Sequence, residues 1–454
     1  MDSLEEELRA FRQPMRFVPD DVLTMIFAYA IPWCSGDGIA MESFPTSWDS
    51  ETRLDLPWTL SHVCRNWRAL CISLPRLWST MYIRLPKSPG PGFGEKMDVI
   101  YHRRSEPIPL RLWIRKDAFK LDPLLPLLKS AHRWRCVRLA LEYHGGFSHV
   151  DVFHDCLFPC LTHLSLQPCR TEKRIAYIQA PRLQKLELIG TPIRCKLSFP
   201  WDQFTWYKST NSALEIIGFM KNLQEIVIEE NGCWYHKEYK WDAEKIILPR
   251  VRRLEYGYVD DSDKRDLNSV GPSDSLQNIW LFTHYNFTSL QTLIIDDSYH
   301  AYDQRLATSL PSVIELSLCF GDANFIRGVL LATPNVQSLH IECDFDTESL
   351  LCPSPGQPSV SDLHSLKHLS FVFKSDSLDI MDFPAIDEAV TALKTHGLPL
   401  ATISFYSGIQ DDGSTVTQTQ WTTCVRDGMA DSLREWMDGG LRVQYHYDAE
   451  HRFP

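Results

Sequence analysis

The sequence lacks any stretch of about 18 consecutive apolar residues, so we expect no membrane-spanning helix. Its first residues, Met1-Asp2-Ser3-Leu4-Glu5-Glu6-Glu7, are acidic and lack the apolar core of a signal peptide. A basic excess is also missing, because the 454 residues carry a formal net charge of −12. That charge argues against a general nucleic-acid binder. These absences favour a cytoplasmic or nuclear chain that binds neither membranes nor nucleic acid.

Motifs of catalysis and of cofactor or metal binding are missing as well. The sequence has no glycine-rich phosphate loop between a strand and a helix, and no Gly-x-Ser-x-Gly nucleophile elbow. It has neither HExxH nor paired CxxC, and the cluster from His154 to His163 has a spacing that matches no common zinc motif. We therefore expect a protein that is not an enzyme and that holds no cofactor or metal. Its 13 cysteines are expected to be reduced, mostly as small buried apolar side chains.

Two short amphipathic segments are present near the N-terminus. In the first, Pro19 suits the opening turn of a helix. Apolar residues then recur at helical spacing until Pro32 ends the helix, at Val22, Leu23, Ile26, Phe27 and Ala30. A second helix is predicted to start near Pro57 and to place on one side Leu60, Val63, Cys64, Trp67, Leu70 and Cys71. Helices this short are not stable alone, so other structure must cover their apolar stripes.

The two segments share a definite spacing: Val18-Pro19-x-Asp21-Val22-Leu23-x-x-Ile26-Phe27, then Leu60-x-x-Val63-Cys64-x-x-Trp67-x-x-Leu70, then Leu-Pro-x-Leu-Trp from Leu74 to Trp78. This pattern resembles an F-box and is similar in particular to the F-box proteins abundant in fungi. The loop between the two segments is longer than in a compact F-box.

The resemblance implies docking on a Skp-family adaptor, which joins F-box proteins to a cullin-based ubiquitin ligase. It assigns adaptor contact and packing of the module, without dividing the two roles, to Pro19, Val22, Leu23, Ile26, Phe27, Leu60, Val63, Cys64, Trp67 and Leu70. The alternative is a small helical cap on the domain that follows.

Beyond residue 100 a repeat recurs with the form apolar-x-x-apolar-x-apolar, which is typical of a turn followed by a strand. Its first apolar residue, here called the anchor, occurs at Trp134, Leu161, Leu183, Leu223, Val251, Leu290, Val313, Val336, Leu366 and Leu400. A proline that would set the turn into the strand lies two residues before five anchors, at Pro159, Pro181, Pro249, Pro311 and Pro334. Helices are predicted over 211–220, 324–331, 384–397 and 421–436, and a last strand over 441–445.

The repeat resembles an irregular leucine-rich-repeat solenoid, because most anchors are spaced near the ~20–29 residues of that family. The expected fold class is α+β to α/β: a small N-terminal helical F-box, then an irregular leucine-rich-repeat-like solenoid with a parallel sheet. The expected organisation is a tail over 1–15, the helical module over 16–85 with an inserted loop over 33–56, a linker over 86–100 and the solenoid over 101–454.

In such a solenoid each strand adds one rung to a parallel sheet, and side chains flanking the inward apolar residues lie on the opposite face. We expect polar residues on that face to bind a protein target: His163, Gln167, Lys185, Glu187, Glu225, Glu229, Arg253, Glu255, His340 and His368. The resemblance implies the substrate-recognition subunit of a cullin-based (SCF-type) E3 ubiquitin ligase. The alternative is a non-catalytic interaction scaffold whose helical module only caps the solenoid.

Overall fold

The computed structural model describes residues 18–30, 56–85, 103–116, 125–141, 156–167, 176–189, 197–210, 215–230, 245–258, 281–282, 284–296, 310–319, 323–342, 363–373, 391, 399–407 and 430–447. The expected tail, the linker and the inserted loop apart from Leu56 lie outside these residues. The helix predicted over 384–397 lies outside them too, apart from Thr391.

The chain divides into two compact units, Met1–Gln203 and Phe204–Pro454. Among its described residues, the first unit begins with α2 (Asp20–Ala30), α4 (Leu56–Val63), α5 (Arg65–Ser73) and the 3-10 helix η4 (Pro75–Trp78). Its longer strands are β1 (Thr80–Leu85), β2 (Leu110–Lys116), β3 (Trp134–Leu141), β4 (His163–Gln167) and β6 (Lys185–Ile189). Short elements lie between and after them: α7 (Leu125–Leu128), η7 (Ala131–Arg133), β5 (Ala176–Tyr177), β7 (Leu197–Ser198) and η9 (Trp201–Gln203).

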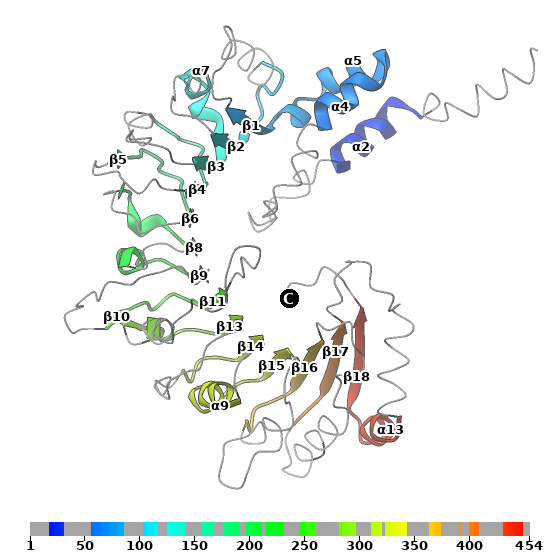
Figure 1. Ribbon diagram of the computed structural model, residues 1–454, viewed down its shortest axis with the longest axis vertical. Helices are drawn as coiled ribbons and strands as arrows, with labels where there is room; N and C mark the ends of the chain where they lie inside the picture. The colour runs from blue at the N-terminus through cyan, green and yellow to red at the C-terminus, as the bar shows by residue number, and fades with distance from the viewer. Residues whose placement is uncertain are drawn as a thin grey trace, which may run out of the picture. The chain divides into compact units, whose positions relative to one another are not determined.

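The second unit consists mainly of strands and also contains helices (Figure 1). Its strands are β8 (Trp206–Thr210), β9 (Glu225–Glu230), β10 (Ile246–Ile247), β11 (Arg253–Tyr258), β12 (Tyr285–Asn286), β13 (Thr292–Asp296), β14 (Glu315–Cys319), β15 (Ser338–Glu342), β16 (His368–Phe373), β17 (Thr402–Ser407) and β18 (Arg442–Tyr447). Its helices are η10 (Glu215–Phe219), α9 (Ala323–Ala332) and α13 (Ala430–Asp438). The helix predicted over 324–331 and the strand predicted over 441–445 are thereby confirmed. In the described part of the range 211–220 a short 3-10 helix, η10, stands where a helix was predicted, and in the described part of the range 421–436 the predicted helix is present as α13.

A long parallel sheet of 14 strands runs through the chain in sequence order. The first unit supplies β1-β2-β3-β4-β6, and the second supplies β8-β9-β11-β13-β14-β15-β16-β17-β18. Each strand is therefore one rung that follows its predecessor, as in a solenoid. The coarse expectation of an α/β chain with a parallel repeat sheet is confirmed.

The anchors mark where each rung begins. The turn before β6 shows the pattern: the Leu183 backbone N–H donates to the Ala180 carbonyl at 3.1 Å, with Pro181 at the second turn position. Proline suits that position because its ring presets the required φ. The same bond closes the turns at Pro159, Pro311 and Pro334. Nine of the ten anchors, among them Leu183, Leu290 and Val313, are almost fully buried, and Leu400 is half-buried, so the repeat pattern correctly located these rungs.

Apolar residues of successive strands stack to form the core. In the second unit one row runs Tyr207, Ile226, Leu254, Leu293, Leu316, Leu339, Leu369 and Ile403, each residue paired with the next in register. All eight are buried. Because side chains alternate across a strand, the residues between them lie on the opposite, polar face of the sheet.

The prediction of one continuous second helix is wrong. Cys64 adopts an extended conformation, with φ −157° and ψ 172°, and separates α4 from α5. Its Sγ accepts a hydrogen bond from the Trp67 backbone N–H at 3.5 Å, so the thiol caps the start of α5. The break leaves Val63 and Cys64 exposed, whereas Cys71 is buried.

Three strands of the long sheet were not predicted. Strand β1 fits the repeat, with Trp78 as its anchor and Met81 and Ile83 buried, but its sequence lies within the range assigned to the helical module. In strand β2 the register with β3 shifts between Leu110 and Arg111, so that β2 has one residue fewer at this point than the repeat pattern predicts. Strand β8 has Phe204 and Tyr207 in the right places, but polar Ser209 occupies the third apolar position.

Candidate functional site

Helix α2 carries apolar side chains on two different faces. Leu23 and Phe27, four residues apart, are 1% and 0% exposed and form the inward face. On the other face Val22, Met25, Ile26 and Tyr29 recur with the i, i+3, i+4, i+7 spacing of a second helical stripe. A helix that only capped the sheet would need one such stripe, so the second requires a separate explanation.

The inward face joins the helices to the first strands. Phe27 meets the Trp67 ring of α5 edge-on, with ring centroids 4.9 Å apart. The buried cluster around Phe27 includes Trp78 of η4 and Trp113 of β2. The Asn66 side-chain amide donates to the Asp20 carboxylate at 3.0 Å and fixes the start of α5 against the start of α2. The helices and the first two strands therefore share one core.

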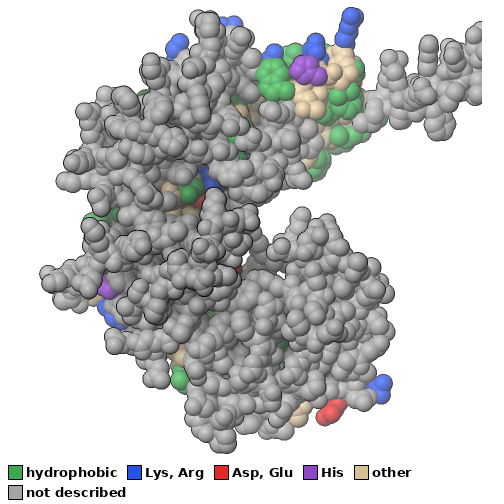
Figure 2. All heavy atoms as spheres, viewed as in Figure 1, with side chains coloured by type: hydrophobic (Ala, Val, Ile, Leu, Met, Phe, Trp, Pro, Cys, Tyr) green, Lys and Arg blue, Asp and Glu red, His purple; other side chains and the backbone are tan. Residues whose placement is uncertain are grey.

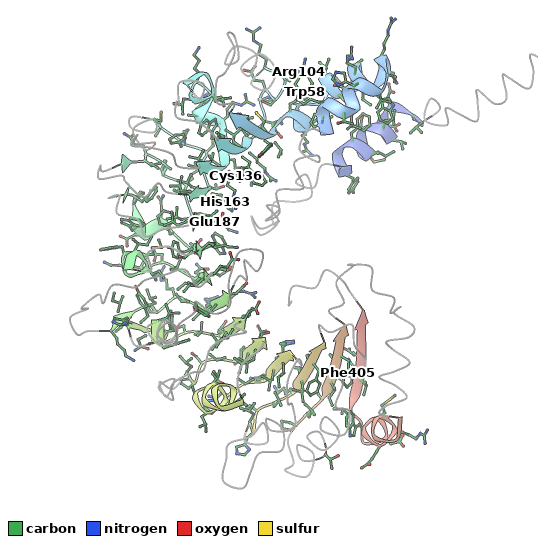
Figure 3. The ribbon with its side chains drawn as sticks, in the orientation of Figure 1. Trp58, Arg104, Cys136, His163, Glu187 and Phe405 are labelled. Atoms are coloured by element: carbon green, nitrogen blue, oxygen red, sulfur yellow. The ribbon has the colours of Figure 1, made fainter. Side chains whose placement is uncertain are left out.

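An arginine beside two tryptophans adds to this junction. The Arg104 guanidinium lies 4.5 Å from the centre of the Trp78 ring and 5.6 Å from that of Trp58, both distances within the range of a cation–π contact (Figure 3). Trp58 and Trp78 meet edge-on at 5.3 Å. The segment that leads into β2 thus holds α4 and η4 in place.

The outward stripe is not covered by the part of the chain that the structure describes. The exposed fractions are 55% for Met25, 42% for Ile26 and 82% for Tyr29. Val63, at the end of α4, is 57% exposed, and it lies three residues before Asn66, which contacts the start of α2. Figure 2 shows hydrophobic side chains gathered on the surface of these helices. Large apolar side chains grouped in this way mark interaction surfaces.

The ten residues assigned to the F-box-like module fall into three groups. Leu23 and Phe27 are buried, and Val22, Leu60, Trp67 and Leu70 are half-buried, the last three packed against the core. Pro19, Ile26, Val63 and Cys64 are exposed. The outward stripe also contains Met25 and Tyr29, which sequence reasoning missed. Their spacing from Val22 and Ile26 is the signal that would have found them.

The polar face of the sheet is the second candidate surface. In the first unit the strand register aligns Arg111, Cys136, His163 and Lys185 in one row. A second row aligns Trp113, Arg138, Ser165 and Glu187. The labelled residues Cys136, His163 and Glu187 follow one another along the sheet in Figure 3.

Cys136 and His163 are adjacent within the first row. The Cys136 Sγ lies 3.7 Å from the His163 Nδ1, and the Thr162 hydroxyl lies 2.8 Å from the same nitrogen. Burial, together with the smaller effects of the cations Lys185, Arg135 and Arg111, lowers the pKa of His163 to about 4. Burial also raises the pKa of the Cys136 thiol. Both groups are therefore neutral at neutral pH, which is the wrong state for a thiolate nucleophile.

In the second unit, taken by itself, carboxylates outnumber cations among the described residues of the polar face. Its described rows include Glu225, Glu229, Glu255 and Glu315, accompanied by Lys208 and Arg253. The Lys208 ammonium forms an ion pair with Glu229, and the Arg253 guanidinium lies 3.4 Å from the Glu255 carboxylate. Burial raises the pKa of Glu255 despite that contact. This part of the face is predominantly acidic.

The predicted target-binding residues occupy this polar face in both units, through the rows that hold His163, Lys185, Glu187, Glu225, Glu229, Arg253, Glu255, His340 and His368. The backbone of Gln167 lies on it too, but its side chain is outside the described residues. Glu187 is buried, whereas Glu225 and His368 are exposed. Burial lowers the pKa of His340, whose Nε2 lies 3.2 Å from the Ser338 hydroxyl.

Among the described residues no group of three His, Cys, Asp or Glu side chains could hold a metal ion. Within the same residues no helix is long and apolar enough to cross a membrane. Comparison of the chain with protein-family models finds no match. Comparison with curated proteins finds no significant match either.

Proposed function

We propose that this chain is a substrate-recognition subunit of a cullin-based (SCF-type) ubiquitin ligase. In this proposal the helices α2, α4 and α5 are an F-box that docks on a Skp-family adaptor. The sheet is an irregular leucine-rich-repeat-like solenoid whose polar face receives a protein target. The chain brings target and ligase together, which raises the local concentration of target at the transfer site, and needs no catalytic residue of its own.

The observation that carries the proposal is the second apolar stripe of α2. Full burial of an aliphatic side chain contributes roughly 1.5–3 kcal/mol. Applied to the exposed fractions of Met25, Ile26 and Val63, this gives about 2–5 kcal/mol on docking. Tyr29, 82% exposed, adds an aromatic ring of the kind enriched at interfaces. This gain supports docking without using the core residues Leu23 and Phe27.

A non-catalytic interaction scaffold is the second candidate function. What favours it is the shared core: Trp113 of β2 packs with Leu23 and Phe27 of α2, as expected if the helices cap the first rung. A solenoid needs such a cap, because its terminal strand otherwise exposes an apolar edge. The two candidate functions differ over Met25, Ile26 and Tyr29: adaptor docking requires these exposed side chains, and a cap does not.

Co-purification with a Skp-family adaptor tests the proposal. Ile26→Asp is expected to lower adaptor affinity about a hundredfold or more, because a carboxylate would be buried against an apolar partner. Leu331→Asp is the matched control, since Leu331 is a 64% exposed leucine on helix α9 of the other unit. Equal adaptor binding by both variants and by the unchanged chain would favour the scaffold instead.

A further inference from the structure

The polar face of the first unit is cationic although the chain as a whole is acidic. Arg111 of β2, Arg138 of β3 and Lys185 of β6 lie on it, in two adjacent rows. Arg135, at the start of β3, lies close enough to act electrostatically on Cys136 and His163. Within the described parts of these two rows, Glu187 is the one carboxylate. Against a net charge of −12, this local excess of cations is not a consequence of composition.

Three of these cations act electrostatically on the same histidine. Lys185, Arg135 and Arg111 come from three different strands, and each lowers the pKa of His163. The same three lower the pKa of the neighbouring Cys136 against the larger effect of burial. A site where separate cations reinforce one another is positive in potential and stabilises an anion.

A buried hydroxyl lies at the same place. Ser165 pairs in register with Arg138 on one side and with Glu187 on the other, two residues from His163 along β4. Its Oγ is fully buried, and among the described residues it has no hydrogen-bond partner. Its neighbours Leu164 and Leu186 lie in the core, so alternation places Ser165 on the polar face. A buried hydroxyl without a partner costs free energy unless a ligand or water meets it.

We propose that the polar face of β2, β3, β4 and β6 binds an acidic segment of the target protein, with its carboxylate or phosphate groups held by Arg111, Arg138 and Lys185 around Ser165. This rests on the proposed function, since it names the chemistry that the polar face accepts from a target. Arginine and lysine suit both kinds of anion through charge-assisted hydrogen bonds. The acidic face of the second unit would repel such a segment, so the specificity belongs to the first unit alone.

Fluorescence anisotropy with labelled synthetic peptides tests the proposal on the full chain. The peptides share one Gly/Ser sequence that carries interspersed Glu, phosphoserine or Lys. We expect the Glu peptide, the phosphoserine peptide or both to bind, the Lys peptide not to bind, and binding to weaken as salt is added. Binding of only one acidic peptide identifies whether the anion is a carboxylate or a phosphate.

Charge-neutralising variants then locate the site. Lys185→Gln and Arg111→Gln should each weaken acidic-peptide binding about tenfold, the value of one lost charge-assisted hydrogen bond. Arg182→Gln is the matched control, because it removes one positive charge from the exposed turn just before β6. Circular dichroism and the melting temperature verify that each variant is folded.

Several results would overturn the proposal: no binding of either acidic peptide, equal binding of the Lys peptide, or equal weakening by all three variants. Tighter binding of a single-stranded oligonucleotide than of both peptides would assign the site to nucleic acid instead. None of these assays involves the adaptor. Failure here, with adaptor binding still sensitive to Ile26→Asp, would therefore remove the acidic-segment site and leave the proposed function standing.

Discussion

Replacing Phe27 with alanine is expected to destabilise the first unit strongly, whereas Ile26→Ala next to it should be nearly neutral. The two residues are adjacent on α2 but face in different directions. Phe27 is fully buried and packs edge-on against Trp67, in a cluster that extends to Trp113 of β2. Ile26 is 42% exposed.

The magnitude follows from burial. A buried Phe→Ala change costs about 3–5 kcal/mol, and the edge-on ring contact accounts for about 0.5–1.5 kcal/mol of interaction with Trp67. Ile26→Ala removes side-chain atoms that are already partly in water, and alanine favours the helix, so we expect a change within about 1 kcal/mol. Because the cluster joins α2 to β2, Phe27→Ala should loosen both elements.

Hydrogen exchange read by mass spectrometry is the suitable assay, because the chain has two units and global unfolding need not be two-state. Faster exchange is expected over 20–30 and 110–116 in Phe27→Ala, with 323–342 in the second unit as the internal control. If exchange over 110–116 stays unchanged while α2 alone loosens, the helices and strands do not share a core. Equal effects of the two substitutions would refute the assignment of the two faces of α2.

Two further predictions concern glycine and pH. Gly440, after α13, has φ +85°, so Gly440→Ala should cost about 1–2 kcal/mol of stability and speed hydrogen exchange over 430–447. A Cβ added at Gly328, within α9, meets no atom within 4 Å, so Gly328→Ala should instead stabilise the chain by about 0.5–1 kcal/mol. The pKa of His163 is about 4 in the folded chain and 6.5 in the unfolded chain. Between these pH values the unfolded state binds one proton more than the folded state. The contribution of His163 to stability is therefore full above pH 6.5 and is lost as the pH falls toward 4. The free energy of unfolding of the first unit, measured with denaturant, should be about 2 kcal/mol lower at pH 5 than at pH 7 because of His163. The variant His163→Gln should lose this difference. A pH dependence that persists unchanged in the variant would contradict the assignment to His163.

The parallel rungs were predictable from the sequence because their pattern is local. The anchor, the proline two residues before it and the two following apolar residues all lie within one turn and one strand. Several of these turns are closed by a bond between residues three apart, such as Leu183 to Ala180, so the residues that specify such a turn are neighbours in the sequence. Where the pattern failed, a local departure explains it: the polar Ser209 in β8, or the irregular register at Leu110 in β2.

The helical break at Cys64 was not predictable in the same way. The residues from Leu60 to Cys71 fit one helical stripe, and helical spacing alone does not distinguish one helix from two. The break depends on the Cys64 thiol accepting from the Trp67 backbone N–H, and on the Arg68 side chain donating to the Ser61 carbonyl at 3.0 Å across the break. These contacts form only once both helices are in place.

Sequence by itself determined that this chain has short amphipathic N-terminal helices and repeated turn–strand units, because helical and strand periodicities are properties of neighbouring residues. It could not decide which apolar residues of α2 form the core and which remain outside. Val22, Leu23, Ile26 and Phe27 are alike in apolarity. Only packing in the cluster that includes Trp113, and against Trp67, buries Leu23 and Phe27, whereas Val22 stays half-buried and Ile26 exposed. Likewise, only the register of the strands brings Arg111, Lys185 and Ser165, from distant segments, onto one face, since the distance between rungs is set by the sheet and not by the chain.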